Sequence, residues 1–251
     1  MPLVPAVAHR PSFIVIKVHP RVRSFVAARL SPEGELGLHV TIGAILMMIA
    51  AAVFGNLAAD VVSHDDITEL DAFLANWFHS HKNSIWTGPM LFITNTHDVL
   101  GVSLMASALG LYFYLNKARY WLICLVLAVP GGQLLNVLLK TIFQRARPSF
   151  DEPLLTLSTY SFPSGHTLGA TVFYGVLAAY LVCVLPRWNA RILVVLGACT
   201  MVALVALSRV YLGAHYLSDV LGAMVEGCGW LAVCITSCST LRRRRAARLS
   251  E

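Results

Sequence analysis

The chain has 251 residues, of which 57% are hydrophobic and only 13% are charged, and its net charge is +6. Soluble domains carry about 25% charged residues, so this composition excludes an ordinary soluble protein and indicates an integral membrane protein. The cations gather in the N-terminal region, in short connections and in the run Arg242-Arg243-Arg244-Arg245. A basic tail directly after an apolar run is typical of membrane orientation and contact with anionic lipids, so we expect membrane lipids as partners and no nucleic acid.

Six apolar runs follow one another, each long enough for a helix that crosses the bilayer, which needs about 20 residues. The predicted spans cover residues 39–59, 90–115, 120–139, 167–185, 190–207 and 217–237. We therefore predict an all-α, polytopic membrane protein with six transmembrane helices. Its predicted organisation is a cytoplasmic N-terminal tail over residues 1–38, a six-helix membrane domain over residues 39–238 and a basic cytoplasmic tail over residues 239–251.

Residues 66–81, between the first two spans, have a different pattern. Apolar residues recur there at helical spacing: Ile67, Leu70, Phe73, Leu74, Trp77 and Phe78. The stretch is too short to cross the bilayer and is polar at its ends, so we predict an amphipathic helix that lies on the outer membrane interface. A loop helix packed on the bundle is the alternative, and the two interpretations are compatible.

The lysines and arginines of the short connections predict the orientation. If six spans alternate, the basic N-terminal tail, the connections after the second and fourth spans and the arginine run all fall on one side, which should be the cytoplasm. We therefore expect a multi-pass protein of the cytoplasmic membrane with both termini inside. Lys140, Arg147 and Arg209 then fall on the outer side, and charges that oppose the orientation signal are more often functional.

Three short clusters on that outer side carry the chemistry. They are the segment from Lys140 to Pro148, the turn Pro163-Ser164-Gly165-His166, and Ser208-Arg209 followed by His215 and Asp219. Cleavage of a phosphate ester needs cations and donors that hold the phosphoryl oxygens. Lys140, Arg147 and Arg209 supply the cations. Ser164 and Gly165 precede an apolar helix, and the N-terminus of a helix is a binding site for anions.

The two histidines divide the remaining work. His215 and Asp219 are four residues apart, so the carboxylate can hold one imidazole nitrogen and leave the other free to attack phosphorus. His166 has no carboxylate near it in the sequence and is the better candidate for the general acid. No group of carboxylates suits Mg²⁺ and no cysteine–histidine set suits zinc, so we expect neither a metal ion nor a cofactor.

Together the clusters resemble the three-part signature of the type 2 phosphatidic acid phosphatase superfamily, which includes bacterial membrane lipid phosphatases and undecaprenyl pyrophosphate phosphatases. The signature is Lys-x6-Arg-Pro, Pro-Ser-Gly-His and Ser-Arg-x5-His-x3-Asp, and the chain matches every position in order and spacing. The resemblance implies a metal-independent phosphohydrolase that works through a phosphohistidine. It implies that His215 is the nucleophile, Asp219 its orienting acid and His166 the general acid. The phosphate ligands that it implies are Lys140, Arg147, Ser164, Gly165 and Arg209.

For other polar residues inside the predicted spans, a structural role is favoured over a functional one. Gln133 and Asn136 share a face with Lys140, where hydrogen bonds between helices are favoured over support of the lysine. Glu226 is an intramembrane carboxylate and hence a functional hypothesis. Its place seven residues after Asp219, about 10 Å along the helix, favours a structural hydrogen bond.

The predicted function is removal of phosphate from a lipid phosphate or pyrophosphate at the outer face of the cytoplasmic membrane. A polyprenyl pyrophosphate is the first choice, because the short outer loops offer no domain that would enclose a large headgroup; phosphatidylglycerol phosphate and phosphatidic acid are alternatives. Transfer of the phosphate to an acceptor other than water stays open. A non-catalytic lipid transporter is disfavoured because binding does not require the histidine–carboxylate pair. Vanadate-dependent haloperoxidases share the pocket but are soluble. The sequence leaves the oligomeric state open.

Overall fold

The computed structural model describes residues 19–31, 37–151, 154–155 and 157–250; the rest of the predicted N-terminal tail lies outside these ranges. Within them the chain forms α-helices and no β-strand, which confirms the all-α fold. In chain order the helices are α1 (Pro20–Leu30), α2 (Leu38–Ser63), α3 (Asp66–Ser80), α4 (Ser84–Thr96), α5 (Val99–Leu115), α6 (Arg119–Phe143), α7 (Gly165–Val184), α8 (Trp188–Tyr211) and α9 (Leu217–Ser250).

Five of the described helices, α2, α6, α7, α8 and α9, are long and apolar enough to cross a membrane. The pair α4 and α5 passes the same test only as one span bent by 55°. The chain is therefore a multi-pass helical membrane protein with five or six candidate spans. Many large apolar side chains on the outside of the bundle are exposed, as expected for surfaces that face lipid.

The second predicted span, residues 90–115, is wrong as one continuous helix. His97 and Asp98 separate α4 from α5. The Asp98 carboxylate accepts a hydrogen bond from the backbone N–H of Gly101 at 2.7 Å and so caps α5. The buried His97 ring contacts the Tyr174 hydroxyl at 2.8 Å. These hydrogen bonds therefore stabilise a break between two helices. The average hydropathy of residues 90–115 does not reveal this break.

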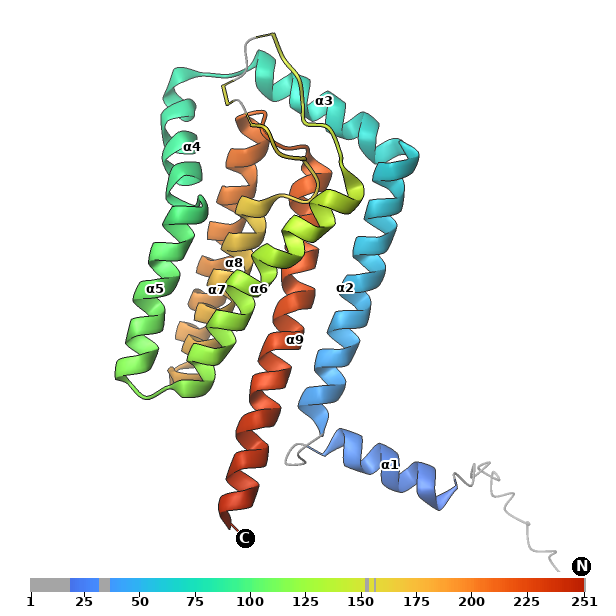
Figure 1. Ribbon diagram of the computed structural model, residues 1–251, viewed down its shortest axis with the longest axis vertical. Coiled ribbons are helices and arrows are strands. Elements are labelled where there is room, and N and C mark those ends of the chain that lie inside the picture. Colours follow the sequence, from blue (N-terminus) through green and yellow to red (C-terminus); the bar gives the residue numbers. More distant parts are fainter. Residues whose placement is uncertain (1–18, 32–36, 152–153, 156, 251) are drawn as a thin grey trace, which may run out of the picture.

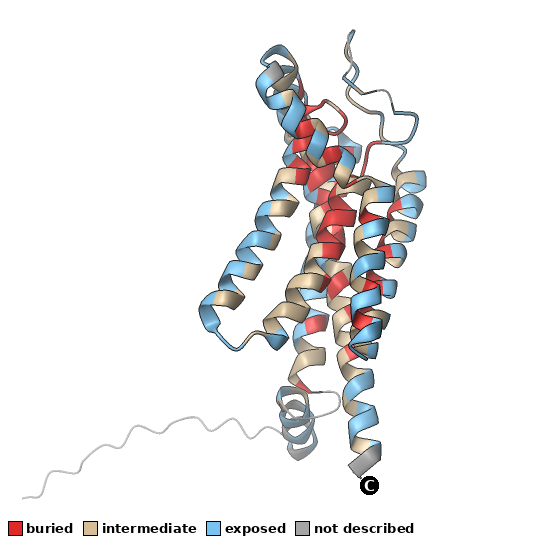
Figure 2. Cartoon of the chain, turned by 90° about the vertical axis from the view of Figure 1, so that its left-hand side faces the viewer, coloured by how far each residue is buried: buried red, intermediate tan, exposed pale blue. Residues whose placement is uncertain are grey.

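The bundle is built around α7 and α9. α9 packs against α2, α6 and α7, while α7 also packs against α8, and α5 and α4 complete the bundle on α6 and α8. The main core cluster lies among α5, α6, α7 and α9 and includes the fully buried Phe113, Ala128 and Val172. Figure 2 shows that buried residues line the middle of the bundle and that exposed residues cover its outer faces. The helices thus form one packed scaffold.

The two ends of this bundle differ (Figure 1). α3 crosses one end, at the place where the sequence predicts an amphipathic helix, and the connection between α6 and α7 lies beside it. α1 and the C-terminus lie at the other end. α9 continues to Ser250, so the arginine run extends the last helix past the predicted end of the membrane domain at residue 238.

Candidate active site

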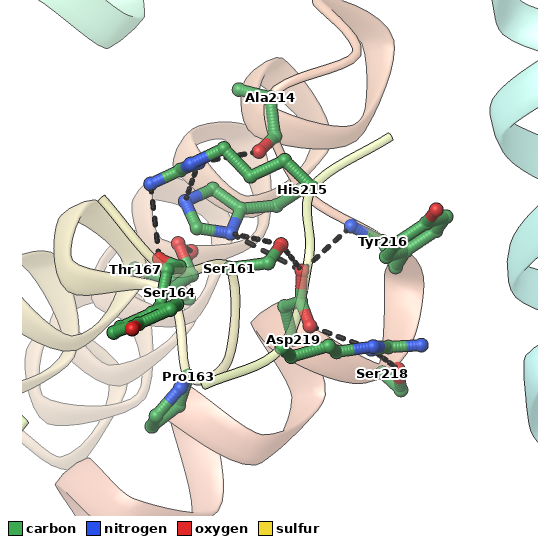
Figure 3. Close-up of polar contacts among 12 residues, drawn as sticks. Ser161, Pro163, Ser164, Thr167, Ala214, His215, Tyr216, Ser218 and Asp219 are labelled. Atoms are coloured by element: carbon green, nitrogen blue, oxygen red, sulfur yellow. Dashed lines mark hydrogen bonds and ion pairs between the residues drawn. The ribbon is translucent and has the colours of Figure 1, made fainter. Parts of the chain in front are cut away.

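The three clusters meet at the end of the bundle that α3 crosses. The last turns of α6 and α8, the first turns of α7 and α9, and the connections next to them supply Lys140, Arg147, Ser164, Gly165, His166, Arg209, His215 and Asp219. Figure 3 shows the His215 ring, the Ser161 hydroxyl and the Asp219 carboxylate directed at one another. The fold therefore joins segments that are up to about eighty residues apart in the sequence.

His215 and Asp219 form the centre of the site. His215 lies just before α9 and Asp219 in its first turn, and His215 Nδ1 is 3.3 Å from Asp219 Oδ2. Their side chains are only 2% and 0% exposed. The other ring nitrogen, Nε2, lies 3.2 Å from Arg147 Nη1. Because arginine can only donate, we assign Nε2 as the acceptor and place the imidazole proton on Nδ1, facing Asp219.

The Asp219 carboxylate collects several donors. Oδ2 accepts from the His215 ring, from the Ser161 hydroxyl and, at 2.9 Å, from the backbone N–H of Tyr216. Oδ1 accepts from Arg145 Nη1 at 2.6 Å. Burial lowers the pKa of His215 to about 3, although Asp219 acts in the opposite direction. The imidazole is therefore neutral at neutral pH and keeps a lone pair on Nε2.

Of the three cations near the end of α6, Lys140 and Arg147 donate to backbone oxygens. Arg147 donates to the Ala214 carbonyl at 2.6 Å and to carbonyls of the connection between α6 and α7, besides its contact with His215. Lys140 Nζ donates to the Tyr160 carbonyl at 2.6 Å. Both side chains thus fix the loop around the imidazole, and a phosphate would have to share their donors.

Arg209 has a donor left over. The residue is 2% exposed, and Nη1 donates to the Thr94 hydroxyl on α4. Its Nε has no hydrogen-bond partner within the described part of the chain. A buried donor of a charged group is costly when unpaired, so this atom indicates a binding site for an anion.

The Ser164-Gly165 turn offers fewer donors than the sequence suggests. The Ser164 backbone N–H donates to the Asp219 carbonyl at 3.0 Å, so it ties the start of α7 to α9 and is not available to phosphate. The Ser164 hydroxyl accepts from Thr167 at 3.1 Å and keeps its own proton to donate. The Gly165 N–H, in the first position of α7, is the backbone donor that remains.

His166 differs from His215 in its surroundings. It lies in the first turn of α7 and is partly exposed. Cationic side chains surround it, Arg209, Arg147 and Lys140 among them, and its ring makes no ion pair or hydrogen bond with a carboxylate of the described residues. This contrast matches the sequence-based distinction, in which only His215 has an orienting acid.

Three polar residues of the neighbouring spans hold the turn before α7. Gln133 Nε2 donates to the Gly165 carbonyl at 3.1 Å. Asn136 Nδ2 donates to Glu226 Oε2 at 3.1 Å and to the Pro163 carbonyl at 3.4 Å. These are hydrogen bonds between helices, as the sequence favours for both amides and for Glu226. The bonds to the Gly165 and Pro163 carbonyls fix the turn before α7.

Three further residues of the site carry no assigned role in the sequence-based prediction. Ser161 is buried and donates to Asp219. Arg145 lies at a position that the signature leaves open, and Asp71 lies on α3. A signal for Asp71 existed, because it follows Ile67 by four residues and so falls on the apolar side of the predicted helix. A buried carboxylate on that side requires a partner.

No group of three or more His, Cys, Asp or Glu side chains within residues 19–31, 37–151, 154–155 and 157–250 is arranged to hold a metal ion. The side chains that do converge are two imidazoles, one carboxylate and several cations. This set suits the transfer of a phosphoryl group to nitrogen, because the cations can hold the phosphoryl oxygens while a neutral imidazole attacks.

Comparisons with known proteins establish the family. The model of the PAP2 superfamily matches residues 119–243, which contain all three clusters. Over 153 residues the chain is 30% identical to undecaprenyl-diphosphatase BcrC of Bacillus subtilis (strain 168). The match covers 58% of this chain and 72% of that protein. The chain belongs to the PAP2 superfamily. The resemblance drawn from the three clusters is therefore confirmed.

Two more proteins resemble this PAP2 chain. Phosphatidylglycerophosphatase B of Bacillus subtilis (strain 168) is 42% identical over 120 residues, which are 47% of this chain and 57% of that protein. The crystal structure of a transmembrane PAP2-type phosphatidylglycerolphosphate phosphatase from Bacillus subtilis matches with a TM-score of 0.69 and 28% identity, over 75% of this chain and 94% of that chain. All three relatives are named as phosphatases of lipids, which supports a lipid phosphatase.

Proposed function

We propose that this PAP2 protein is a lipid phosphate phosphatase in which His215 attacks phosphorus and forms a phosphohistidine. The observation that carries the proposal is the buried pair of His215 and Asp219, in which the carboxylate holds Nδ1 and Nε2 faces a cation. A transporter needs cations for binding a phosphate but has no use for an imidazole oriented in this way. Catalysis is therefore favoured over transport.

In the first step, Nε2 of His215 attacks phosphorus and the bond from phosphorus to the leaving oxygen breaks. His166, which the negative charge of the bound phosphate keeps protonated, gives that oxygen its proton. Asp219 stabilises the positive charge that the imidazole gains. Arg147 turns Nη1 from Nε2 to a phosphoryl oxygen, which releases the lone pair when substrate arrives. The Nε of Arg209, which has no hydrogen-bond partner among the described residues, supplies a further donor to the phosphoryl group.

In the second step, water attacks phosphorus, and His166, now neutral, takes a proton from that water. The bond between nitrogen and phosphorus breaks, its electron pair returns to His215, and inorganic phosphate leaves. Lys140, the Ser164 hydroxyl and the Gly165 N–H complete the phosphate ligands. The nucleophile of the first step and the acid and base of both steps come from this chain, and water is the nucleophile of the second step.

A lipid substrate is supported by an apolar groove of about 660 Å³ between α5 and α6. Val102, Leu125 and Val129 line it, and it reaches Gln133, which binds the Gly165 carbonyl at the start of α7. We infer that the groove holds a chain of the substrate lipid, because a chain there would leave its phosphate beside the phosphate-binding turn. The same groove would give a soluble phosphate ester no advantage.

Different relatives favour different lipids. The 42% identity to phosphatidylglycerophosphatase B favours phosphatidylglycerol phosphate, and the similarity to undecaprenyl-diphosphatase favours a polyprenyl pyrophosphate, the first choice from the sequence. Both combine a small phosphorylated headgroup with long apolar chains. We place phosphatidylglycerol phosphate first because the identity to its phosphatase is higher.

The test measures kcat/KM of the purified protein in detergent for phosphatidylglycerol phosphate, a polyprenyl pyrophosphate, phosphatidic acid and a soluble sugar phosphate. One of the lipids should be preferred, activity should survive EDTA, and vanadate should inhibit as a mimic of the five-coordinate transition state. A preference for the sugar phosphate, or activity that chelation removes and one divalent metal restores, would contradict the proposal.

The groove is tested by Ala106→Phe, which narrows it. This variant should lower kcat/KM for long-chain lipids and spare a short aryl phosphate. Leu111→Phe is the matched control, because Leu111 is 58% exposed on the same helix and lies outside the groove lining. An equal loss of kcat/KM for the lipid and the aryl phosphate would show that the groove does not bind the lipid chain.

We also propose that the site lies at the outer face of the cytoplasmic membrane, with α3 at the interface and both termini inside. The support is the division of the bundle seen in Figure 1, where α3 lies at one end and α1 and the C-terminus lie at the other. The arginine run of α9 belongs to the second end, and basic residues favour the cytoplasm.

A further inference from the structure

Asp71 on α3 is a buried carboxylate that belongs to none of the three clusters. It is 1% exposed. Oδ1 accepts the backbone N–H of Ser218 at 2.9 Å, and Oδ2 accepts the Ser218 hydroxyl and, at 2.8 Å, Nη2 of Arg145. A charge buried to this depth is costly unless it is paired and hydrogen-bonded. Its partners fasten α3 to the start of α9.

Arg145 connects this carboxylate to the histidine–carboxylate pair. While Nη2 binds Asp71, Nη1 donates to Asp219 Oδ1 at 2.6 Å and to the Ser218 hydroxyl at 2.6 Å. The guanidinium carbon lies 4.4 Å from the centre of the Tyr216 ring, which covers one face of the cation. Burial acts to lower the pKa of Arg145, but Asp219 and Asp71 raise this pKa overall, so the guanidinium stays charged.

We propose that Arg145 and Asp71 are positioning residues of the phosphatase reaction, an inference that rests on the proposed function. Arg145 holds Oδ1 of Asp219 and thereby leaves Oδ2 turned toward His215. Asp71 balances the charge of Arg145. α3 is then part of the catalytic centre, although it does not have to touch the substrate.

The charge balance explains why the cation has two acidic partners. Arg145 and Asp219 alone would form a neutral ion pair, and little negative charge would remain for the imidazole. One guanidinium with two carboxylates leaves one net negative charge, and Oδ2 of Asp219 presents it to His215. The ring becomes positive only during attack on phosphorus, so this charge stabilises the transition state more than the ground state.

The test compares kcat and KM of Asp71→Asn, Arg145→Gln and the double variant in the full-length protein purified in detergent. Each single variant should lose kcat roughly 10- to 100-fold, the effect of one hydrogen bond to a charged group, while KM changes by less than about threefold. The double variant should be about as slow as Arg145→Gln and not slower, because Asp71 acts on Asp219 through Arg145. Glu69→Gln removes an exposed acid from the same helix and should keep the wild-type kcat.

Wild-type kcat in Asp71→Asn, a loss confined to KM, or multiplied losses in the double variant would overturn the inference. If Arg145→Gln does not elute as folded protein, Arg145→Lys replaces it. Lysine keeps the charge but cannot bridge two carboxylates in a fixed fork, so the same fall in kcat is expected, and a wild-type kcat would contradict the inference. A wild-type protein that forms no phosphohistidine refutes the proposed function instead, which separates the two failures.

Discussion

Replacing Asp219 by asparagine removes the charge that faces His215 and keeps the shape of the side chain. The amide oxygen can still accept from the imidazole, Ser161 and the Tyr216 N–H, which bind Oδ2 in the native protein. The amide NH₂ would then face Arg145, where Oδ1 now accepts at 2.6 Å. The variant therefore keeps the size of the side chain but removes both the negative charge and the acceptor of Arg145.

The expected magnitude follows from the 3.3 Å between His215 Nδ1 and Asp219 Oδ2. Two unit charges at that distance interact by about 5 kcal/mol at an effective dielectric constant of about 20. The imidazole is neutral before attack and positive during it, so most of this interaction acts on the transition state. Because about 1.4 kcal/mol corresponds to a factor of ten in rate, kcat should fall about 10³- to 10⁴-fold.

The assay measures phosphate release from a saturating lipid phosphate in detergent, with KM determined for the same substrate. Glu226→Gln is the matched control, because it neutralises another buried carboxylate of α9 and keeps an acceptor for Asn136. Its kcat should stay within about threefold of the wild type. If Asp219→Asn also stayed within about tenfold, the carboxylate would not stabilise a charged imidazole and the reasoning would be refuted.

Ser161→Ala removes one hydrogen-bond donor to Asp219 and should lower kcat about tenfold. This loss is near the lower end expected for a hydrogen bond to a charged group, because other donors to Asp219 remain. An unchanged kcat would show that Ser161 has no role in the reaction. The folded protein keeps His215 neutral, with a pKa of about 3, whereas the unfolded chain binds a proton below about pH 6.5. Stability should therefore decrease as the pH falls from about 6.5 toward 3, and the melting temperature of His215→Asn should depend less steeply on pH in that window; an equal slope would contradict this origin. An impermeant maleimide should label a cysteine at Ser149 in intact cells and one at Ala246 only after permeabilisation, with the unsubstituted protein as background, and the reverse pattern would invert the proposed topology.

Much of the fold is readable from the sequence because crossing a bilayer imposes a long apolar run on each span. The break at His97 and Asp98 is not, because the buried His97 needs the Tyr174 hydroxyl, which only the fold brings near it. The Asp98 cap on α5 and the contact between His97 and Tyr174 let the helix stop inside an apolar segment. The polar pair inside the run was the only local sign.

The site divides in the same way. The meeting of His215, Asp219 and the cations was predictable, because transfer of a phosphoryl group to nitrogen requires these residue types at one place. Arg145 and Asp71 were not, because they act on His215 through Asp219. The two carboxylates that Arg145 binds, Asp71 and Asp219, each lie 74 residues from it in the sequence. Nor does spacing disclose that the Ser164 backbone N–H is already bound to Asp219.

The proposed reaction requires His215 to carry the phosphate. Its most direct test is to incubate the protein with a lipid labelled in the scissile phosphate, quench within the first turnover, and locate the acid-labile, base-stable label by peptide mapping. We expect label on the peptide that contains His215 and no label in His215→Ala. In His166→Ala the label should persist longer, because hydrolysis then lacks its base. Label acquired by His215→Ala, or label on His166 in the wild type, would contradict the account.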